Sequence, residues 1–142
     1  MLGVQYNTIH IKEGDKWEAT FITPLGLFEP TVMFFSLCGS PPTFQAFLNF
    51  NFAAYIREGW LVIYMDDLAI GAYSSMDLDQ KVHLFLQCFH DLGLSLKLSK
   101  CEFNKSEVKF LGMVVGRGCI HMDPANLSAI ATWPPPKTIK AI

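Results

Sequence analysis

Two apolar runs on either side of an adjacent pair of acids place the strongest constraint on how this 142-residue chain can fold. Residues 61–65 read Leu-Val-Ile-Tyr-Met, Asp66 and Asp67 follow, and residues 68–71 read Leu-Ala-Ile-Gly. Short apolar runs of this kind, separated by a polar break, are typical of two strands joined by a tight turn. The sequence therefore predicts a β-hairpin that carries both carboxylates at its turn.

Two stretches with helical periodicity lie before and after this hairpin. Residues 41–58 carry apolar side chains at helical spacing after Ser40, a good N-cap residue, and Gly59 can end this helix. Residues 76–92 place their apolar side chains on one face, and Gly93 closes the helix. The residues expected to form these apolar faces are Phe44, Phe47, Leu48, Phe52 and Tyr55 in the first, and Leu78, Val82, Phe85, Leu86, Phe89 and Leu92 in the second.

The remaining pattern predicts further short elements. Residues 6–12 and 17–22 are expected to pair as a hairpin across Glu13-Gly14-Asp15. Short strands are expected near 95–98 and 108–115, and a last short helix at 124–133. Strands and helices in this order predict an α+β fold, an antiparallel sheet with helices packed on one face.

The acidic pair at the turn is open to two interpretations. Charges are costly to hold beside apolar strands unless they are paired. A hard divalent cation such as Mg²⁺ would pair with Asp66 and Asp67, and such ions serve two-metal phosphoryl transfer. The alternative is that both acids cap a solvent-exposed turn, where Asp is common. These residues by themselves leave both interpretations open.

Charge and composition narrow the class of protein. The chain has 11 Lys+Arg against 13 Asp+Glu, so net charge alone does not suggest a nucleic-acid partner. Its four cysteines are widely spaced, which fits reduced thiols. The sequence contains no uninterrupted apolar run of membrane-spanning length and no recognisable targeting signal. We therefore predict an intracellular protein, in the cytoplasm or nucleus, without a membrane partner.

Several blocks occur in an order that resembles the reverse transcriptases. Tyr64-Met65-Asp66-Asp67 is the YMDD motif of that family, and Pro41-Pro42-Thr43-Phe44-Gln45 resembles the core of its nucleotide-binding motif. Residues 6–17, 26–37, 93–103, 110–112, 120–124 and 133–136 are similar to further family segments. The resemblance covers essentially the whole chain, and among these enzymes the sequence is most similar to those of gypsy-type long-terminal-repeat retrotransposons.

The resemblance implies a polymerase palm-like fold over residues 1–123, with residues 124–142 as the start of the connection region or a linker. It implies a fragment of an RNA-directed DNA polymerase that performs metal-dependent nucleotidyl transfer with Mg²⁺ or Mn²⁺. The implied partners are an RNA/DNA template-primer and deoxynucleotides.

The resemblance also assigns roles to individual residues. Asp66 and Asp67 would bind the metal and serve catalysis, and Lys100 would lie near the leaving pyrophosphate, with Lys97 as a competitor for that role. The residues implied to border the nucleotide are Tyr6, Gln45 and Met65. Those implied to grip the primer end are Phe110, Leu111 and Gly112.

One departure from the family pattern bears on activity. The family has an aspartate five residues before the position of Tyr6, and Met1 stands there in this sequence. We therefore expect a truncated chain that lacks the first catalytic carboxylate and the upstream fingers segment, binds metal weakly and is inactive in isolation. The alternative is a degenerate, non-catalytic remnant that acts at most as a nucleic-acid or protein interaction module. Self-association through uncovered palm surface is also expected.

Overall fold

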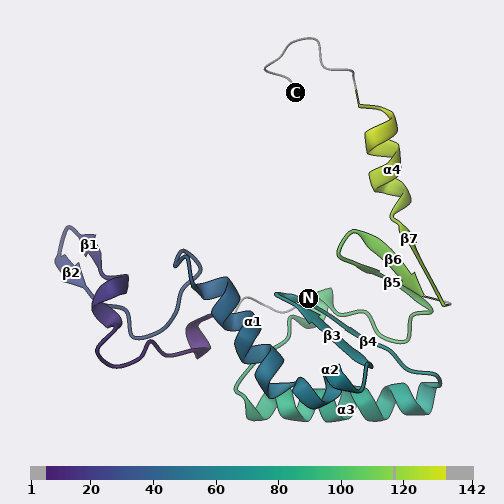
Figure 1. The fold of residues 1–142 in the computed structure, drawn as a ribbon, viewed down its shortest axis with the longest axis horizontal. Helices are drawn as coiled ribbons and strands as arrows, with labels where there is room; N and C mark the ends of the chain where they lie inside the picture. The colour runs from purple at the N-terminus through teal and green to yellow at the C-terminus, as the bar shows by residue number, and fades with distance from the viewer. Residues whose placement is uncertain (1–5, 117, 134–142) are drawn as a thin grey trace. The chain divides into compact units, whose positions relative to one another are not determined.

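The computed structural model describes residues 6–116 and 118–133. These residues fall into two compact units, one within Met1–Cys101 and the other within Glu102–Ile142 (Figure 1). This boundary reflects packing. The division at residues 123 and 124 that the resemblance implies concerns function, and it stays a prediction.

A two-stranded hairpin forms the centre of the first unit and confirms the predicted one. Strand β3 (Leu61–Tyr64) pairs antiparallel with β4 (Asp67–Ile70) in a register that places Tyr64 opposite Asp67. Leu61 and Ile63 are buried, whereas Val62 and Tyr64 are exposed. This alternation follows from the period of two in a strand, so one face of the hairpin is committed to the core.

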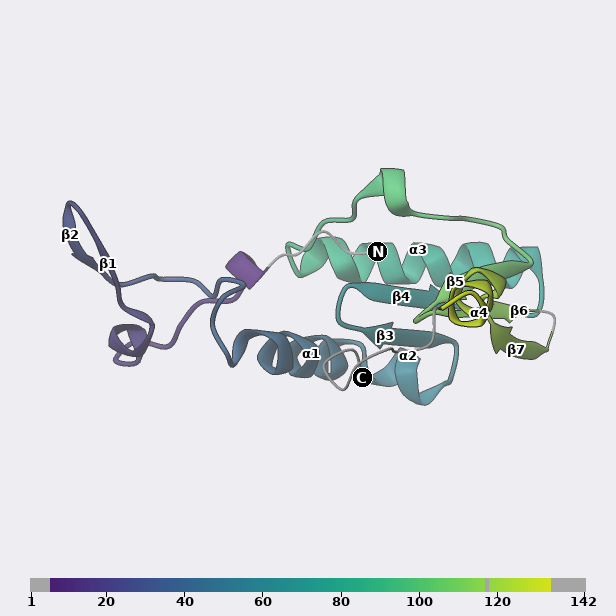
Figure 2. The ribbon, with the colours of Figure 1, turned by 90° about the horizontal axis from the view of Figure 1, so that it is seen from above.

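Helices cover that buried face of the hairpin (Figures 1 and 2). Helix α1 (Ser40–Asn51) and the short α2 (Ala53–Arg57) replace the single helix expected over 41–58, because the backbone leaves helical geometry at Phe52. Helix α3 (Ser75–Asp91) matches the second predicted helix. Its N-cap is Ser74, whose side chain accepts a hydrogen bond from the Asp77 amide.

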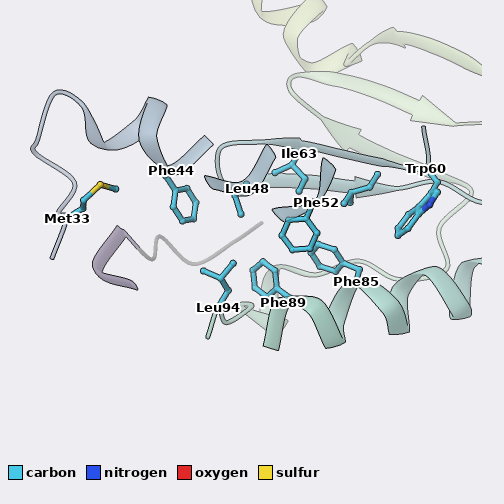
Figure 3. Packing of buried hydrophobic residues seen from close by; sticks show 10 residues of the cluster. Met33, Phe44, Leu48, Phe52, Trp60, Ile63, Phe85, Phe89 and Leu94 are labelled. Carbon is cyan, nitrogen blue, oxygen red and sulfur yellow. The ribbon is translucent and has the colours of Figure 1, made fainter. Parts of the chain in front are cut away.

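The aromatic ring of Phe52, between α1 and α2, meets aromatic rings of α3 beneath the hairpin, and these rings form the core of this unit. Figure 3 shows Phe52, Phe85 and Phe89 facing one another, and the ring centroid of Phe85 lies 5.2 Å from those of both Phe52 and Phe89. The other buried members of the cluster are Met33, Phe44, Leu48, Trp60, Leu61, Ile63 and Leu94. Leu86 is 38% exposed, so its predicted place on the buried face is wrong.

The start of α1 corrects a second prediction. Gly39 is the N-cap residue, and Ser40 is the first helical residue. Ser40 is 1% exposed, and its Oγ donates a hydrogen bond of 2.9 Å to the Phe34 carbonyl. The hydroxyl therefore ties the preceding loop to the helix instead of capping the helix end.

The predicted hairpin between 6–12 and 17–22 is wrong. Residues Tyr6–Thr8 and Lys16–Ala19 form 3-10 helices, η1 and η2. The Ile11 amide instead donates to the Thr31 carbonyl at 3.0 Å, and the Met33 amide donates to the Ile9 carbonyl at 2.9 Å. A loose alternation shows that a segment is extended, but it does not show which distant segment pairs with it.

Two further short elements in the first unit also differ from expectation. Strands β1 (Phe21–Thr23) and β2 (Gly26–Phe28) pair as a small antiparallel hairpin. Of the strand expected over 95–98, the structure has a single β-bridge residue, Leu96, and a 3-10 helix, η3, follows over Leu98–Lys100. The β1–β2 hairpin leaves Ile22, Leu25 and Leu27 largely exposed, and the expected self-association stays a prediction.

The second unit is a three-stranded antiparallel sheet followed by a helix. Strands β5 (Glu107–Phe110), β6 (Met113–Gly116) and β7 (Cys119–Met122) pair in chain order, and α4 spans Pro124–Ala131. Strand structure was expected near 108–115, and the structure has β5 and β6 there, with a chain reversal at residues 111–112. Strand β7 was not predicted. Across the described residues, no helix has the length and hydropathy needed to cross a bilayer.

Candidate active site

The turn between β3 and β4 consists of only two residues, Met65 and Asp66. Met65 has a backbone φ of +50°, a conformation that residues other than glycine adopt at a cost in free energy. A positive φ at the first of two turn residues suits the right-handed twist of a tight hairpin. Asp66 therefore lies at the tip, and Asp67 is the first residue of β4.

The carboxylate of Asp66 is held in an unfavourable environment. Its Oδ1 is buried and has no hydrogen-bond partner within the described part of the chain. Burial, and next the negative charge of Asp67, raise the pKa of the Asp66 carboxyl above its usual value, while the charge of Lys100 acts in the opposite direction. A buried, unpartnered carboxylate oxygen beside a second acid is a poor turn cap and a good ligand for a hard cation.

A third ligand side chain does not join this pair among the residues that the structure describes. No group of three or more His, Cys, Asp and Glu side chains there is arranged to hold a metal ion. The predicted position of the first catalytic carboxylate, Met1, lies outside the described residues. The turn by itself thus offers two carboxylates.

The side chain of Gln45 on α1 holds the turn from behind. Its Oε1 accepts a 2.6 Å hydrogen bond from the Met65 amide, and its Nε2 donates to the Ile63 carbonyl at 3.2 Å. Nε2 also donates to Asn49 Oδ1, one helical turn along α1, at 2.8 Å. Sequence reasoning did not foresee this brace. The spacing of Gln45 and Asn49 could have suggested their mutual bond, but the bonds to the turn join residues 18 and 20 positions apart.

Two other predicted site residues lie in the first unit. Lys100 is the last residue of η3 and is exposed, and its positive charge lowers the pKa of the Asp66 carboxyl. The structure places the backbone of Tyr6 in η1, but the Tyr6 side chain lies outside what is described.

The residues predicted to grip the primer form a turn in the second unit. Leu111 and Gly112 join β5 to β6 with backbone φ of +50° and +77°. Asn126 Nδ2 donates to the Gly112 carbonyl at 3.3 Å, which ties the turn to α4. Lys109, one residue before this segment, forms an ion pair with Asp123, with 2.7 Å between Nζ and Oδ2.

Comparison with known proteins identifies the family. A sequence model described as reverse transcriptase (RNA-dependent DNA polymerase) matches residues 3–115, most of the chain. The chain belongs to the reverse transcriptase family. It is 31% identical over 137 residues to the Transposon Tf2-3 polyprotein of Schizosaccharomyces pombe, and 30% identical to the Tf2-7 polyprotein of the same organism. These matches cover 96% of this chain and 10% of each polyprotein, so the chain spans about a tenth of the curated relatives it matches.

Solved structures confirm the fold of this reverse transcriptase region. The foamy viral protease-reverse transcriptase in complex with RNA/DNA hybrid matches with a TM-score of 0.82 and 17% identity, over 99% of this chain and 19% of that one. A second structure, the foamy viral protease-reverse transcriptase dRH in complex with ds DNA, matches with a TM-score of 0.85 over 99% of this chain and 24% of that one. The predicted α+β fold class and the resemblance to retrotransposon reverse transcriptases are therefore confirmed.

Proposed function

We propose that this chain is the palm part of an RNA-directed DNA polymerase and that Asp66 and Asp67 bind its Mg²⁺ or Mn²⁺ ions. One observation carries the proposal. In a member of the reverse transcriptase family, Asp66 Oδ1 is buried without a hydrogen-bond partner among the described residues, at a turn that also presents Asp67. A divalent cation would satisfy this oxygen and offset the repulsion between the two acids.

The surrounding side chains suit nucleotidyl transfer. Bound divalent ions would supply activation of the attacking hydroxyl and stabilisation of the leaving oxygen. Asp66 and Asp67 would hold these ions. The Lys100 ammonium, whose positive charge lowers the pKa of the Asp66 carboxyl, would bind the leaving pyrophosphate. This lowering effect of Lys100 on the pKa of the Asp66 carboxyl supports Lys100 over Lys97 for this role.

Residues around the turn and in the second unit would contact the substrates. Met65 would border the deoxynucleotide from the turn, and Tyr6 from the segment before it. Residues 110–112 would contact the primer end. An RNA/DNA template-primer as partner is supported by the solved relatives, which are bound to RNA/DNA hybrid and to DNA.

Two carboxylates are few for this chemistry. A pair of divalent ions about 4 Å apart carries four positive charges. Among the described residues, the turn offers the two negative charges of Asp66 and Asp67 to balance them. We therefore expect weak metal binding and no primer extension from the 142-residue polypeptide by itself. Catalysis would need a further acidic ligand from another segment.

Titration of the 142-residue chain with Mn²⁺, followed by water-proton relaxation, tests the proposed ligands. We expect millimolar affinity for the wild type and at least about a fivefold loss for Asp66→Asn, because a charged ligand is removed from a low-dielectric site. The matched control is Asp79→Asn, the same chemical change at an exposed position of α3. It should leave the affinity unchanged.

Equal affinity in wild type and Asp66→Asn would overturn the proposed metal site. It would favour the alternative, a non-catalytic nucleic-acid or protein interaction module. Primer extension on a primed RNA template serves as a second readout. Extension by the isolated chain that Asp66→Asn abolishes would show that two carboxylates suffice.

A further inference from the structure

The Gln45 side chain has little hydrogen-bonding capacity left for a ligand. A glutamine amide has two N–H donors and one carbonyl oxygen. One donor is used on the Ile63 carbonyl and the other on Asn49 Oδ1, while the oxygen accepts from the Met65 amide. The partners also fix the orientation of the amide, because the Met65 N–H can only donate and the Ile63 carbonyl can only accept.

Two of these bonds, to the Ile63 carbonyl and the Met65 amide, join the hairpin turn to the best-packed part of the unit. Gln45 lies between Phe44 and Leu48 on α1, which are 1% and 0% exposed and belong to the core cluster. The helix that carries Gln45 is therefore fixed by packing. The hydrogen bonds of the Gln45 side chain hold the backbone at Ile63 and Met65, on both sides of Tyr64, at a fixed position relative to this helix.

The turn needs such a support. Met65 holds a positive φ without being glycine, and Asp66 and Asp67 follow it directly. Repulsion between these acids favours any movement that separates them or exposes the buried Asp66 oxygen. The 2.6 Å bond from the Met65 amide to Gln45 Oε1 opposes that movement at the residue where the turn begins.

We infer that Gln45 is a positioning residue, which sets the separation and direction of the Asp66 and Asp67 carboxylates through the Met65 and Ile63 backbone instead of contacting the nucleotide itself. This inference rests on the proposed function, since it names how the proposed metal site is held. Asn49 serves as a support that keeps the Gln45 amide in its orientation.

The test replaces the amide by an apolar side chain of similar length in the full chain, Gln45→Met, and measures two quantities. The first is hydrogen exchange at the Met65 amide without metal, which should become about three- to tenfold faster when its acceptor is lost. The second is Mn²⁺ affinity, which should fall by about threefold or more. The matched control, Gln87→Met at an exposed position of α3, should change neither.

Amides of the core report whether the variant remains folded. Exchange at Leu61 and Phe89 should match the wild type, so that a general loss of stability is recognised as such. Unchanged Met65 exchange and unchanged Mn²⁺ affinity in Gln45→Met would overturn the positioning role, even where Asp66→Asn still weakens metal binding. Faster Met65 exchange in Gln45→Met together with wild-type affinity in Asp66→Asn would instead overturn the proposed metal site.

Discussion

Replacing Asp66 by asparagine should stabilise the metal-free chain at neutral pH. Burial and the neighbouring Asp67 raise the pKa of the Asp66 carboxyl in the folded chain above the usual 3.8. The folded state therefore binds more protons than the unfolded state within the window that begins near 3.8 and extends upward. Stability falls as pH rises through this window, and the penalty is complete above it. Asparagine carries no charge, so it removes the penalty.

The size of the effect follows from the environment of one oxygen. An unpartnered buried polar atom typically costs about 1–3 kcal/mol. Among the residues that the structure describes, one oxygen of Asp66, Oδ1, is buried without a hydrogen-bond partner, and asparagine would still place a polar atom there, so the lower end of that range applies. We expect a gain of about 1 kcal/mol in the free energy of unfolding, or about 3 °C in Tm for a chain of this length.

Urea unfolding in the presence of a chelator measures the difference directly. The gain of Asp66→Asn over wild type should be full at pH 7.5 and should shrink as the pH falls toward 3.8, where aspartate becomes protonated in both states. Asp79→Asn, at an exposed site on α3, serves as the control and should not show this pH dependence. An Asp66→Asn chain that is equally or less stable at pH 7.5 would refute the claim that Asp66 is an uncompensated acid.

Two further predictions concern backbone features outside the acidic pair. Ser40→Ala should lower the free energy of unfolding in urea by about 1–2 kcal/mol, because the Phe34 carbonyl loses the hydrogen bond from the buried Ser40 hydroxyl. The control Ser128→Ala removes an exposed hydroxyl on α4 and should lower it by less than about 0.5 kcal/mol. Leu111→Asn should slow hydrogen exchange of the β5 and β6 amides by about fivefold, because asparagine tolerates a positive φ at a cost about 1 kcal/mol lower than leucine. Unchanged exchange would mean that the Leu111 conformation is not strained.

Local periodicity was enough to predict the elements that surround the site. The hairpin with Asp66 and Asp67 at its turn formed as expected, because its two strands are adjacent in the sequence and need only a tight turn to pair. Helix α3 and its buried Phe85 and Phe89 were also predicted, since an apolar face repeats along the helix with a fixed period.

Contacts between distant segments were not accessible in the same way. The pairing of residues 9–11 with 31–33 was missed because a strand pattern does not name its partner. The brace from Gln45 to Met65 was missed for the same reason. The helix breaks at Phe52, whose ring packs against Phe85 of α3, and a single-helix pattern contains neither the break nor that contact.

The departures from local rules fall in turns that matter for the proposed chemistry. Three residues other than glycine have a positive φ in the described part of the chain: Met65, Asn104 and Leu111. Asparagine adopts this conformation readily, so Asn104 needs no special account. Met65 and Leu111 do not, and they lie in the two turns that we propose to bind the metal and nucleotide and the primer end. Strain that persists in a folded chain is held by its surroundings, and here Gln45 holds Met65 while Asn126 holds the neighbour of Leu111. The two side-chain hydrogen bonds therefore support the backbone at the two turns for which we propose functional roles.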